Sequence, residues 1–330
     1  MKNSILTKSI SYKDFKKEIL NDYRNIVISR EASLLGRKEV LSGKAKFGIF
    51  GDGKELPQIA MAKVFDKGDF RSGYYRDQTF MFAINKLTVK QFFSGLYANT
   101  SFEEEPMSGG RQMGSHFSSI FVDNKGDFVD LTKQYNISSD ISPTSGQMPR
   151  LLGLAMASKH FRSGKFNCKK LSNNGNEIAW GTIGNASTSE GLFFETVNAI
   201  GVHQVPAVIS IWDDDYGISV DNSYQTTKSS ISEALKGFQR TKTEKGFEIL
   251  TVNGWDYPSL ISTYEHANNI ARNEHVPVII HVTELTQPVG HSTSGSHERY
   301  KSKDRLEWEK SYDCNICLLY TSDAADESSS

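Results

Sequence analysis

The 330-residue chain lacks several features that a secreted, membrane-spanning or nucleic-acid-binding protein needs. It has only three cysteines, too few for a disulfide framework, and no apolar run of the roughly 18 residues that a membrane span requires. Its formal net charge of −1 is not that of a general nucleic-acid binder. The N-terminus has lysines but no continuous apolar core before a cleavage site, so it does not resemble a secretion signal. We therefore expect a cytoplasmic protein that binds neither membranes nor nucleic acids.

The chain beyond residue 147 alternates regularly between two kinds of apolar pattern. Helices are predicted at 148–161, 190–201, 230–238 and 257–272, and strands at 177–183, 206–212, 247–252 and 277–285. This alternation predicts an α/β fold with a parallel sheet flanked by helices. Residues 11 to about 100 show mostly helical spacing and form a helical N-terminal region. Between them, residues 101–146 are rich in glycine, serine and aspartate, and a connection of this length is usually functional or disordered.

Two polar turns follow adjacent predicted strands. The sequence "IWDDDYGIS" (211–219) places three aspartates directly after one strand, and "GNASTSEG" (184–191) follows another. Ligands bind beyond the carboxyl ends of such strands. Adjacent carboxylates must face either water or a cation. Ser187 and Glu190 match a capping box that would start a helix, whose N-terminus attracts anions. One edge of the sheet therefore suits a metal-bound phosphate ester.

These turns resemble the motif of thiamine-diphosphate enzymes, which runs G-D-G, about thirty residues, then N-N. Here "GNA" (184–186) stands at the position of G-D-G, and "DDDYGIS" (213–219) resembles N-N-x-Y-x-I-S. Four further blocks occur in the family's order: "SGYYRDQ" (72–78), "GGRQMGSHF" (109–117), "ISPTSGQMPRLLGLAMASK" (141–159) and "GHSTSG" (290–295). Together they resemble the α subunit, or the α half of a fused chain, of 2-oxoacid dehydrogenase E1 components.

The resemblance implies an oxidoreductase with the thiamine-diphosphate-binding fold. Such an enzyme uses thiamine diphosphate and Mg²⁺ to decarboxylate a 2-oxoacid oxidatively and passes the acyl group to the lipoyl group of an E2 acyltransferase. It also implies a β-type E1 domain or subunit as partner and a dimer of α/β units. The G-R-Q-M block leans toward branched-chain substrates. Two alternatives stay open: a transketolase-like or acetoin-cleaving thiamine enzyme, and a non-catalytic E1-like subunit.

The resemblance also assigns roles to individual residues. The expected cofactor-binding residues are Tyr75, Arg76, Ser142, Thr144, Gly184, Ala186, Ser187, Ile218 and His291. His291 and His116 are the expected catalytic residues. Arg111 either binds a substrate carboxylate or stabilises its own loop.

The expected Mg²⁺ ligands are the side chains of Asn185 and Asp214 and the backbone carbonyl of Tyr216. The family has aspartate first and asparagine second, so this chain exchanges the two at constant charge. We expect Asp213 to brace the turn and Asp215 to be solvated. Asp52 lies in a literal G-D-G, but no strong strand precedes it and no N-N-like turn follows, so we do not expect it to bind the metal.

The resemblance covers the chain to about Asn315. We interpret residues 1–315 as one E1 α-type domain with a helical extension over about 1–100. The tail "CLLYTSDAADE" (317–327) resembles a translated sequencing adapter, so we interpret residues 316–330 as an assembly artefact. We expect a β-type domain, fused or adjacent, to follow in the intact gene, and the isolated chain to be inactive.

Overall fold

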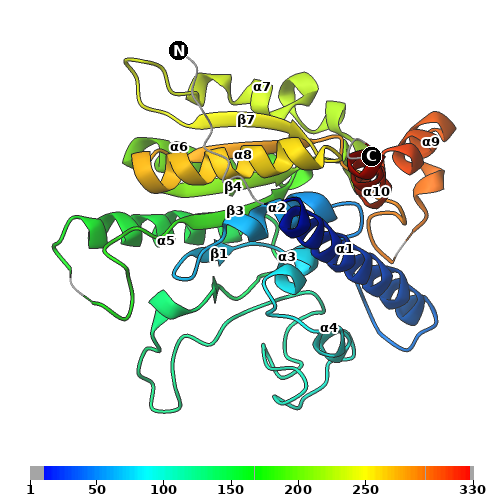
Figure 1. Ribbon diagram of the computed structural model, residues 1–330, viewed down its shortest axis with the longest axis horizontal. Helices are drawn as coiled ribbons and strands as arrows, with labels where there is room; N and C mark the ends of the chain where they lie inside the picture. Colours follow the sequence, from blue (N-terminus) through cyan, green and yellow to red (C-terminus); the bar gives the residue numbers. More distant parts are fainter. Residues whose placement is uncertain (1–10, 167, 294, 328–330) are drawn as a thin grey trace.

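The computed structural model describes residues 11–327, except residues 167 and 294. Over this part of the chain, six parallel strands form one sheet in the order β2-β1-β3-β4-β8-β7 (Figure 1). The strands are β1 (Phe70–Ser72), β2 (Asn136–Ile137), β3 (Ala179–Gly184), β4 (Ala207–Trp212), β7 (Glu248–Asn253) and β8 (Val278–Thr283). The predicted α/β fold is confirmed, and the four strands predicted from the sequence are β3, β4, β7 and β8.

Helices cover both faces of the sheet. Figure 1 shows α8 and α2 in front of the strands, while α5 and α6 lie behind them. The helices are α1 (Tyr12–Leu41), α2 (Glu55–Val64), α3 (Gln78–Ala83), α4 (Val89–Leu96), α5 (Gln147–Arg162), α6 (Gly191–His203), α7 (Ile231–Ala234), α8 (Tyr257–Asn269), α9 (Lys303–Ser311) and α10 (Cys314–Glu327). Among the described residues, none of them is long and apolar enough to cross a membrane.

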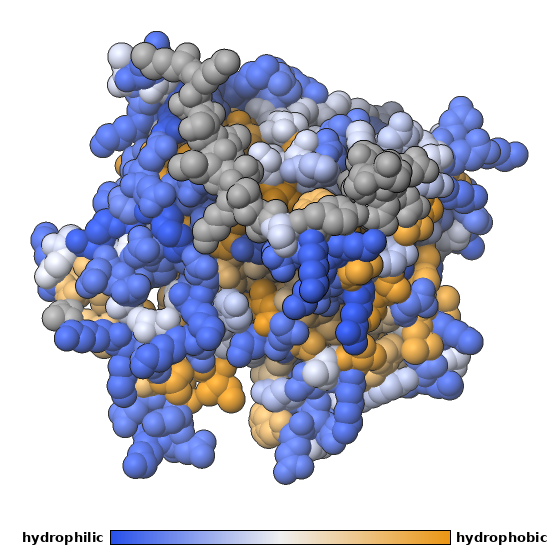
Figure 2. Space-filling view, viewed as in Figure 1, coloured by the Kyte–Doolittle hydropathy of each residue, from blue (hydrophilic) through white to orange (hydrophobic). Residues whose placement is uncertain are grey.

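The central strand β4 shows why the sheet is buried on both sides. All its residues are buried, and successive side chains point to opposite faces. Val208 and Trp212 join the core under α2 and α8, whereas Ile209 and Ile211 join the core under α5 and α6. A continuous apolar run is therefore what this position requires. The face of the molecule seen in Figure 2 is different: it carries mainly hydrophilic side chains, with separate smaller hydrophobic areas.

The N-terminal region is less uniformly helical than expected, because it contains the strand β1. This short strand carries Arg71, whose guanidinium is fully buried between two carboxylates. Its Nε atom donates to Asp77 at 2.6 Å and its Nη1 atom to Asp140 at 3.1 Å. A charged residue in a strand of three residues breaks the apolar run by which buried strands are found, so sequence patterns missed β1.

Two other local predictions were wrong. The helix expected over 230–238 is a single turn, α7, followed by a 3-10 turn at Lys236–Phe238. The capping box is also absent, since Ser187 lies in a 3-10 turn (Ala186–Ser189) and Glu190 is the N-cap of α6 without a side-chain cap bond. The inserted turn moves the start of α6 one turn further along the chain than Ser187 would set it.

Helix α10 packs against the N-terminal helix α1. Helix α10 contacts α1, α2 and α8, and Leu318 is fully buried there. The interpretation of residues 316–330 as an artefact, and of 1–315 as one domain, stays a prediction. Residues 1–10 and 328–330 of these segments lie outside the described part.

Candidate active site

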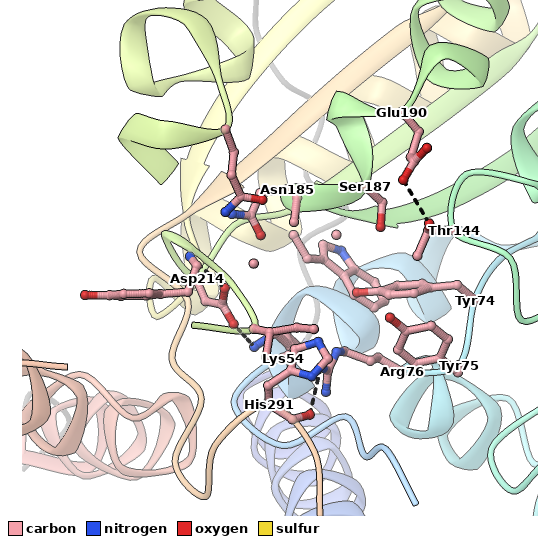
Figure 3. Close-up of a pocket in the computed structure, with 17 residues that line it drawn as sticks. Lys54, Tyr74, Tyr75, Arg76, Thr144, Asn185, Ser187, Glu190, Asp214 and His291 are labelled. Carbon is pink, nitrogen blue, oxygen red and sulfur yellow. Dashed lines mark hydrogen bonds and ion pairs between the residues drawn. The ribbon is translucent and has the colours of Figure 1, made fainter. Parts of the chain in front are cut away.

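A cavity of about 300 Å³ opens at the carboxyl ends of β3 and β4. Figure 3 shows side chains from several elements converging on it. Of the residues predicted for the site, the lining includes Tyr75, Arg76, Thr144, Gly184, Asn185, Ala186, Ser187, Asp214, Tyr216, Ile218 and His291. The lining also includes Lys54, Tyr74, Glu190, Trp212, Gly217 and Gln225, which the sequence analysis did not assign to the site. The cavity thus lies at the sheet edge where ligands of parallel α/β folds bind.

The three consecutive aspartates have three different environments. Asp213 braces the turn as expected: its carboxylate accepts from the backbone N–H of Asp215 at 2.8 Å and lies 2.9 Å from His281 Nε2 on β8. Asp215 adopts a left-handed backbone (φ 67°) and its carboxylate accepts from Arg305 Nη1 at 2.6 Å. The expectation that Asp215 is solvated holds only in part: its side chain is 46% exposed, but α9 also supplies a cation that no local pattern indicates.

Asp214 alone among the three faces the cavity. Its Oδ2 atom lies 2.7 Å from Lys54 Nζ, and its Oδ1 atom accepts from the backbone N–H of Tyr216 at 3.3 Å. Burial by itself would raise the pKa of Asp214, but the attraction of the Lys54 ammonium outweighs burial and holds the pKa at about 2. Asp214 is thus a carboxylate at any ordinary pH, and its charge is already paired.

Lys54 is buried, and its ammonium makes three hydrogen bonds. Besides Asp214, it donates to the carbonyl of Thr286 at 2.8 Å and to Oε1 of Gln287 at 2.7 Å. Gly53 allows this approach: its φ is 81°, and a Cβ there would meet the Thr286 carbonyl at 2.1 Å. The literal G-D-G of residues 51–53 therefore bears on the site, by placing the lysine that follows it. Asp52 itself lies outside the cavity lining, and its carboxylate accepts from Gln287 Nε2 at 2.9 Å.

Asn185 is positioned by the strand pair beneath it. Its backbone N–H donates to the carbonyl of Trp212 at 3.1 Å, which ties the ends of β3 and β4 together. Its side-chain Nδ2 atom is buried and has no hydrogen-bond partner among the described residues. A buried amide without a partner costs free energy unless a ligand satisfies it. The cavity is thus built to receive a polar ligand at this point.

Arg76 brings a guanidinium to the opposite wall. It donates to the carbonyl of His291 at 3.0 Å and to that of Phe50, and it lies 5.6 Å from the ring centre of Tyr75. Two protein cations, Lys54 and Arg76, therefore line a cavity that also contains the Asp214 carboxylate. This arrangement favours an anionic ligand, because a guanidinium and an ammonium both bind phosphate oxygens well.

His291 presents a neutral imidazole to the cavity. Burial first, and then repulsion from Arg76, lower its pKa from 6.5 to about 3. Its Nδ1 atom is buried without a hydrogen-bond partner among the described residues. A neutral ring can accept or donate a proton through that atom, which suits a residue facing a reacting ligand.

Because its pKa is lowered to about 3, His291 should stay neutral across the physiological pH range. A histidine whose pKa is lowered on folding stabilises the folded state above pH 6.5, and the contribution is lost as pH falls toward about 3. We expect the Cε1–H NMR resonance of His291, assigned with His291→Ala, to stay constant between about pH 5 and about pH 8. A midpoint inside that range would contradict the buried, cation-facing environment.

His116 and Ser142 do not line the cavity. They contact each other, with His116 Nε2 and Ser142 Oγ 3.0 Å apart, and the His116 ring stacks on Tyr75 at 6.4 Å between ring centres. Their link to the site therefore passes through Tyr75. Arg111 is exposed and does not line the cavity, and its Nη1 atom donates to the carbonyl of Ser108 in its own loop at 3.0 Å.

The geometry of the predicted metal ligands is mixed. Asn185, Asp214 and Tyr216 line the same cavity, as the prediction requires. Within residues 11–327, apart from 167 and 294, no group of three or more histidine, cysteine, aspartate and glutamate side chains is placed to hold a metal ion. The predicted set, with one carboxylate, one amide and one backbone carbonyl, is of another kind, and its carboxylate is shared with Lys54.

Comparison with known proteins identifies the family. The model of the dehydrogenase E1 component family matches residues 23–319. The chain belongs to this family. It is 27% identical to 2-oxoisovalerate dehydrogenase subunit alpha of Bacillus subtilis, over 90% of this chain and 79% of that protein. It is 26% identical to 2-oxoisovalerate dehydrogenase subunit alpha 1, mitochondrial, of Arabidopsis thaliana, over 81% of this chain and 49% of that protein. It is 25% identical to the pyruvate dehydrogenase E1 component subunit alpha of Acholeplasma laidlawii, over 89% of this chain and 72% of that protein.

Proposed function

We propose that this chain is the cofactor-binding α half of a 2-oxoacid dehydrogenase E1. It would act in the oxidative decarboxylation of a 2-oxoacid, with transfer of the acyl group to the lipoyl group of an E2 acyltransferase. The observation that carries the proposal is the cavity at the ends of β3 and β4, lined by Lys54, Arg76 and the unpartnered amide of Asn185. The family match supports the same reaction class.

Thiamine diphosphate fits this cavity by its chemistry. Arg76 and the Asn185 amide are placed to donate hydrogen bonds to a diphosphate, and Tyr75 and Trp212 offer apolar surface beside them. When bound, the cofactor supplies a thiazolium ring that accepts the electrons released on decarboxylation. His291 would offer Nδ1 of its neutral ring as a hydrogen-bond partner for the bound ligand. His116, bonded to Ser142 and stacked on Tyr75, would orient that tyrosine.

The predicted Mg²⁺ site belongs to the same proposal. Asn185, Asp214 and the Tyr216 carbonyl would supply oxygen ligands, the kind that Mg²⁺ prefers. The partners we propose are a β-type E1 domain or subunit, an E2 lipoyl acyltransferase, and a second α/β unit forming a dimer. The name "subunit alpha" of the relatives supports the first of these. A cytoplasmic location stays a prediction.

A lipoyl-dependent assay tests the proposed reaction. The full chain would be combined with its β-type subunit, thiamine diphosphate, Mg²⁺ and free lipoamide, with 2-oxoisovalerate or pyruvate as substrate. We expect reductive acylation of the lipoamide disulfide, which gives S-acyl dihydrolipoamide and CO₂, only when both subunits and the cofactor are present. Acyl transfer to an aldehyde without lipoamide would favour a transketolase-like or acetoin-cleaving enzyme. Absence of cofactor binding would favour a non-catalytic subunit.

A further inference from the structure

The Asp214 carboxylate already has a cationic partner supplied by the chain itself. Lys54 Nζ lies 2.7 Å from Asp214 Oδ2, and the side-chain exposures of the two residues are 3% and 10% (Figure 3). The three protons of the ammonium have three acceptors, at Asp214, Thr286 and Gln287. An ammonium that is fully hydrogen-bonded and out of water is held firmly, because leaving any acceptor unpaired in the interior is costly.

A divalent cation would need this same carboxylate. Asp214 is the single acidic side chain among the three predicted metal ligands, and Asn185 and the Tyr216 carbonyl are neutral donors. A metal ion at Asp214 would also meet the ammonium of Lys54 at close range in a poorly solvated cavity, where like charges repel strongly. Lys54 and a metal therefore cannot both use Asp214 without cost.

We infer that Lys54 is an internal cation that competes with a divalent metal ion for the Asp214 carboxylate. The chain then binds metal weakly, and a diphosphate in the cavity depends on the guanidinium of Arg76 more than on the metal. The second statement rests on the proposed function, because it takes the ligand to be a diphosphate. The competition for the Asp214 carboxylate concerns only Lys54, Asp214 and the metal.

Metal binding to the full chain tests the competition directly. Mn²⁺ alone is titrated into the wild type, Lys54→Gln and Lys44→Gln, and free Mn²⁺ is followed by its EPR signal. Lys44 is the matched control, since it is an exposed lysine that forms an ion pair with Glu39 at 3.2 Å. We expect Lys54→Gln to bind Mn²⁺ at least about tenfold more tightly than the wild type, and Lys44→Gln to match the wild type. Adding Asp214→Asn to Lys54→Gln should abolish the gain.

A second measurement compares the wild type with Lys54→Gln through a different ligand. Inorganic pyrophosphate is titrated into the wild-type chain with Mn²⁺ and then with EDTA. We expect the affinity of the wild type for pyrophosphate to differ by less than about threefold between Mn²⁺ and EDTA. The affinity of Lys54→Gln for pyrophosphate should fall about tenfold when EDTA replaces Mn²⁺.

Two results would overturn the inference. One is equal Mn²⁺ affinity in the wild type and Lys54→Gln, and the other is a loss of wild-type pyrophosphate binding in EDTA. Failure of thiamine diphosphate to bind the reconstituted enzyme would instead contradict the proposed function. The Mn²⁺ comparison between the wild type and Lys54→Gln would remain valid.

Discussion

Replacing Arg71 with methionine is expected to lower the free energy of unfolding by about 3–5 kcal/mol. The Arg71 guanidinium is fully buried and pairs with both Asp77 and Asp140, whose side chains are also out of water. Its Nη2 atom further donates to the carbonyl of Tyr74 at 3.1 Å. Methionine fills a similar volume but leaves two carboxylates buried without a counter-charge. Chemical denaturation of the wild type and the variant measures the difference.

The loss should depend on pH. Burial raises the pKa of Asp77 to about 6, even though Arg71 opposes the shift. A carboxyl whose pKa is raised on folding stabilises the folded state while protonated, and this contribution is lost as pH rises through about 6. Without Arg71 the pKa rises further, so the variant should be less destabilised at pH 5 than at pH 8. Arg240→Met, which removes partly exposed ion pairs to Glu248 and Glu274, should cost about 1 kcal/mol or less. An equal loss in the two variants would contradict the assigned role of Arg71.

Replacing Arg76 with methionine is expected to weaken thiamine diphosphate binding by about tenfold to 150-fold. Arg76 is a cavity guanidinium, and a hydrogen bond to a charged group contributes about 1.5–3 kcal/mol, where 1.4 kcal/mol corresponds to a factor of ten. The measurement is a calorimetric titration of the cofactor into the chain reconstituted with its β-type subunit. Arg76→Lys keeps the charge but not the planar donor pair, so it should fall between the wild type and Arg76→Met.

The matched control for Arg76 is Arg111→Met. Arg111 is exposed and bonds to its own loop at Ser108, so its loss should leave cofactor affinity within about twofold. Arg76 also donates hydrogen bonds to Phe50 and His291, so its loss could disturb the fold. Circular dichroism of each variant checks that the fold is intact. Equal affinity in Arg76→Met and the wild type would place the diphosphate elsewhere.

The parts of the fold that follow from local apolar patterns were predictable from the sequence. The strands β3, β4 and β8 are almost continuously buried runs, while β7 is only partly buried but still has an apolar run. Helices α5, α6 and α8 carry helical spacing, so each of these elements is recognised without its neighbours. The strand β1 was missed because Arg71 interrupts its pattern, and the charge is tolerated there only because Asp77 and Asp140 meet it. Asp140 is 69 residues away in the chain.

The candidate site, like the fold, was only partly predictable from the sequence. The turns at Asn185 and Asp214 were predicted because both directly follow apolar strands of one sheet. The partners of the aspartates were not, because Lys54 and Arg305 reach them from 160 and 90 residues away. Nothing near Asp215 in the sequence distinguishes a solvated carboxylate from one paired with α9. The literal G-D-G at residues 51–53 was a readable signal for a special backbone, although not for the lysine it places.

The three acceptors of Lys54 are all made long after Lys54 itself during synthesis of the chain. Gln287 lies 233 residues beyond Lys54, a distance that a ribosome covers in roughly 10 to 50 s. Until then the ammonium has to stay hydrated, so the start of α2 cannot settle into its final buried position. The cavity is therefore among the last parts of the molecule to close. A nascent chain that has formed β3 and β4 still has no complete anion site until residues 286 and 287 arrive.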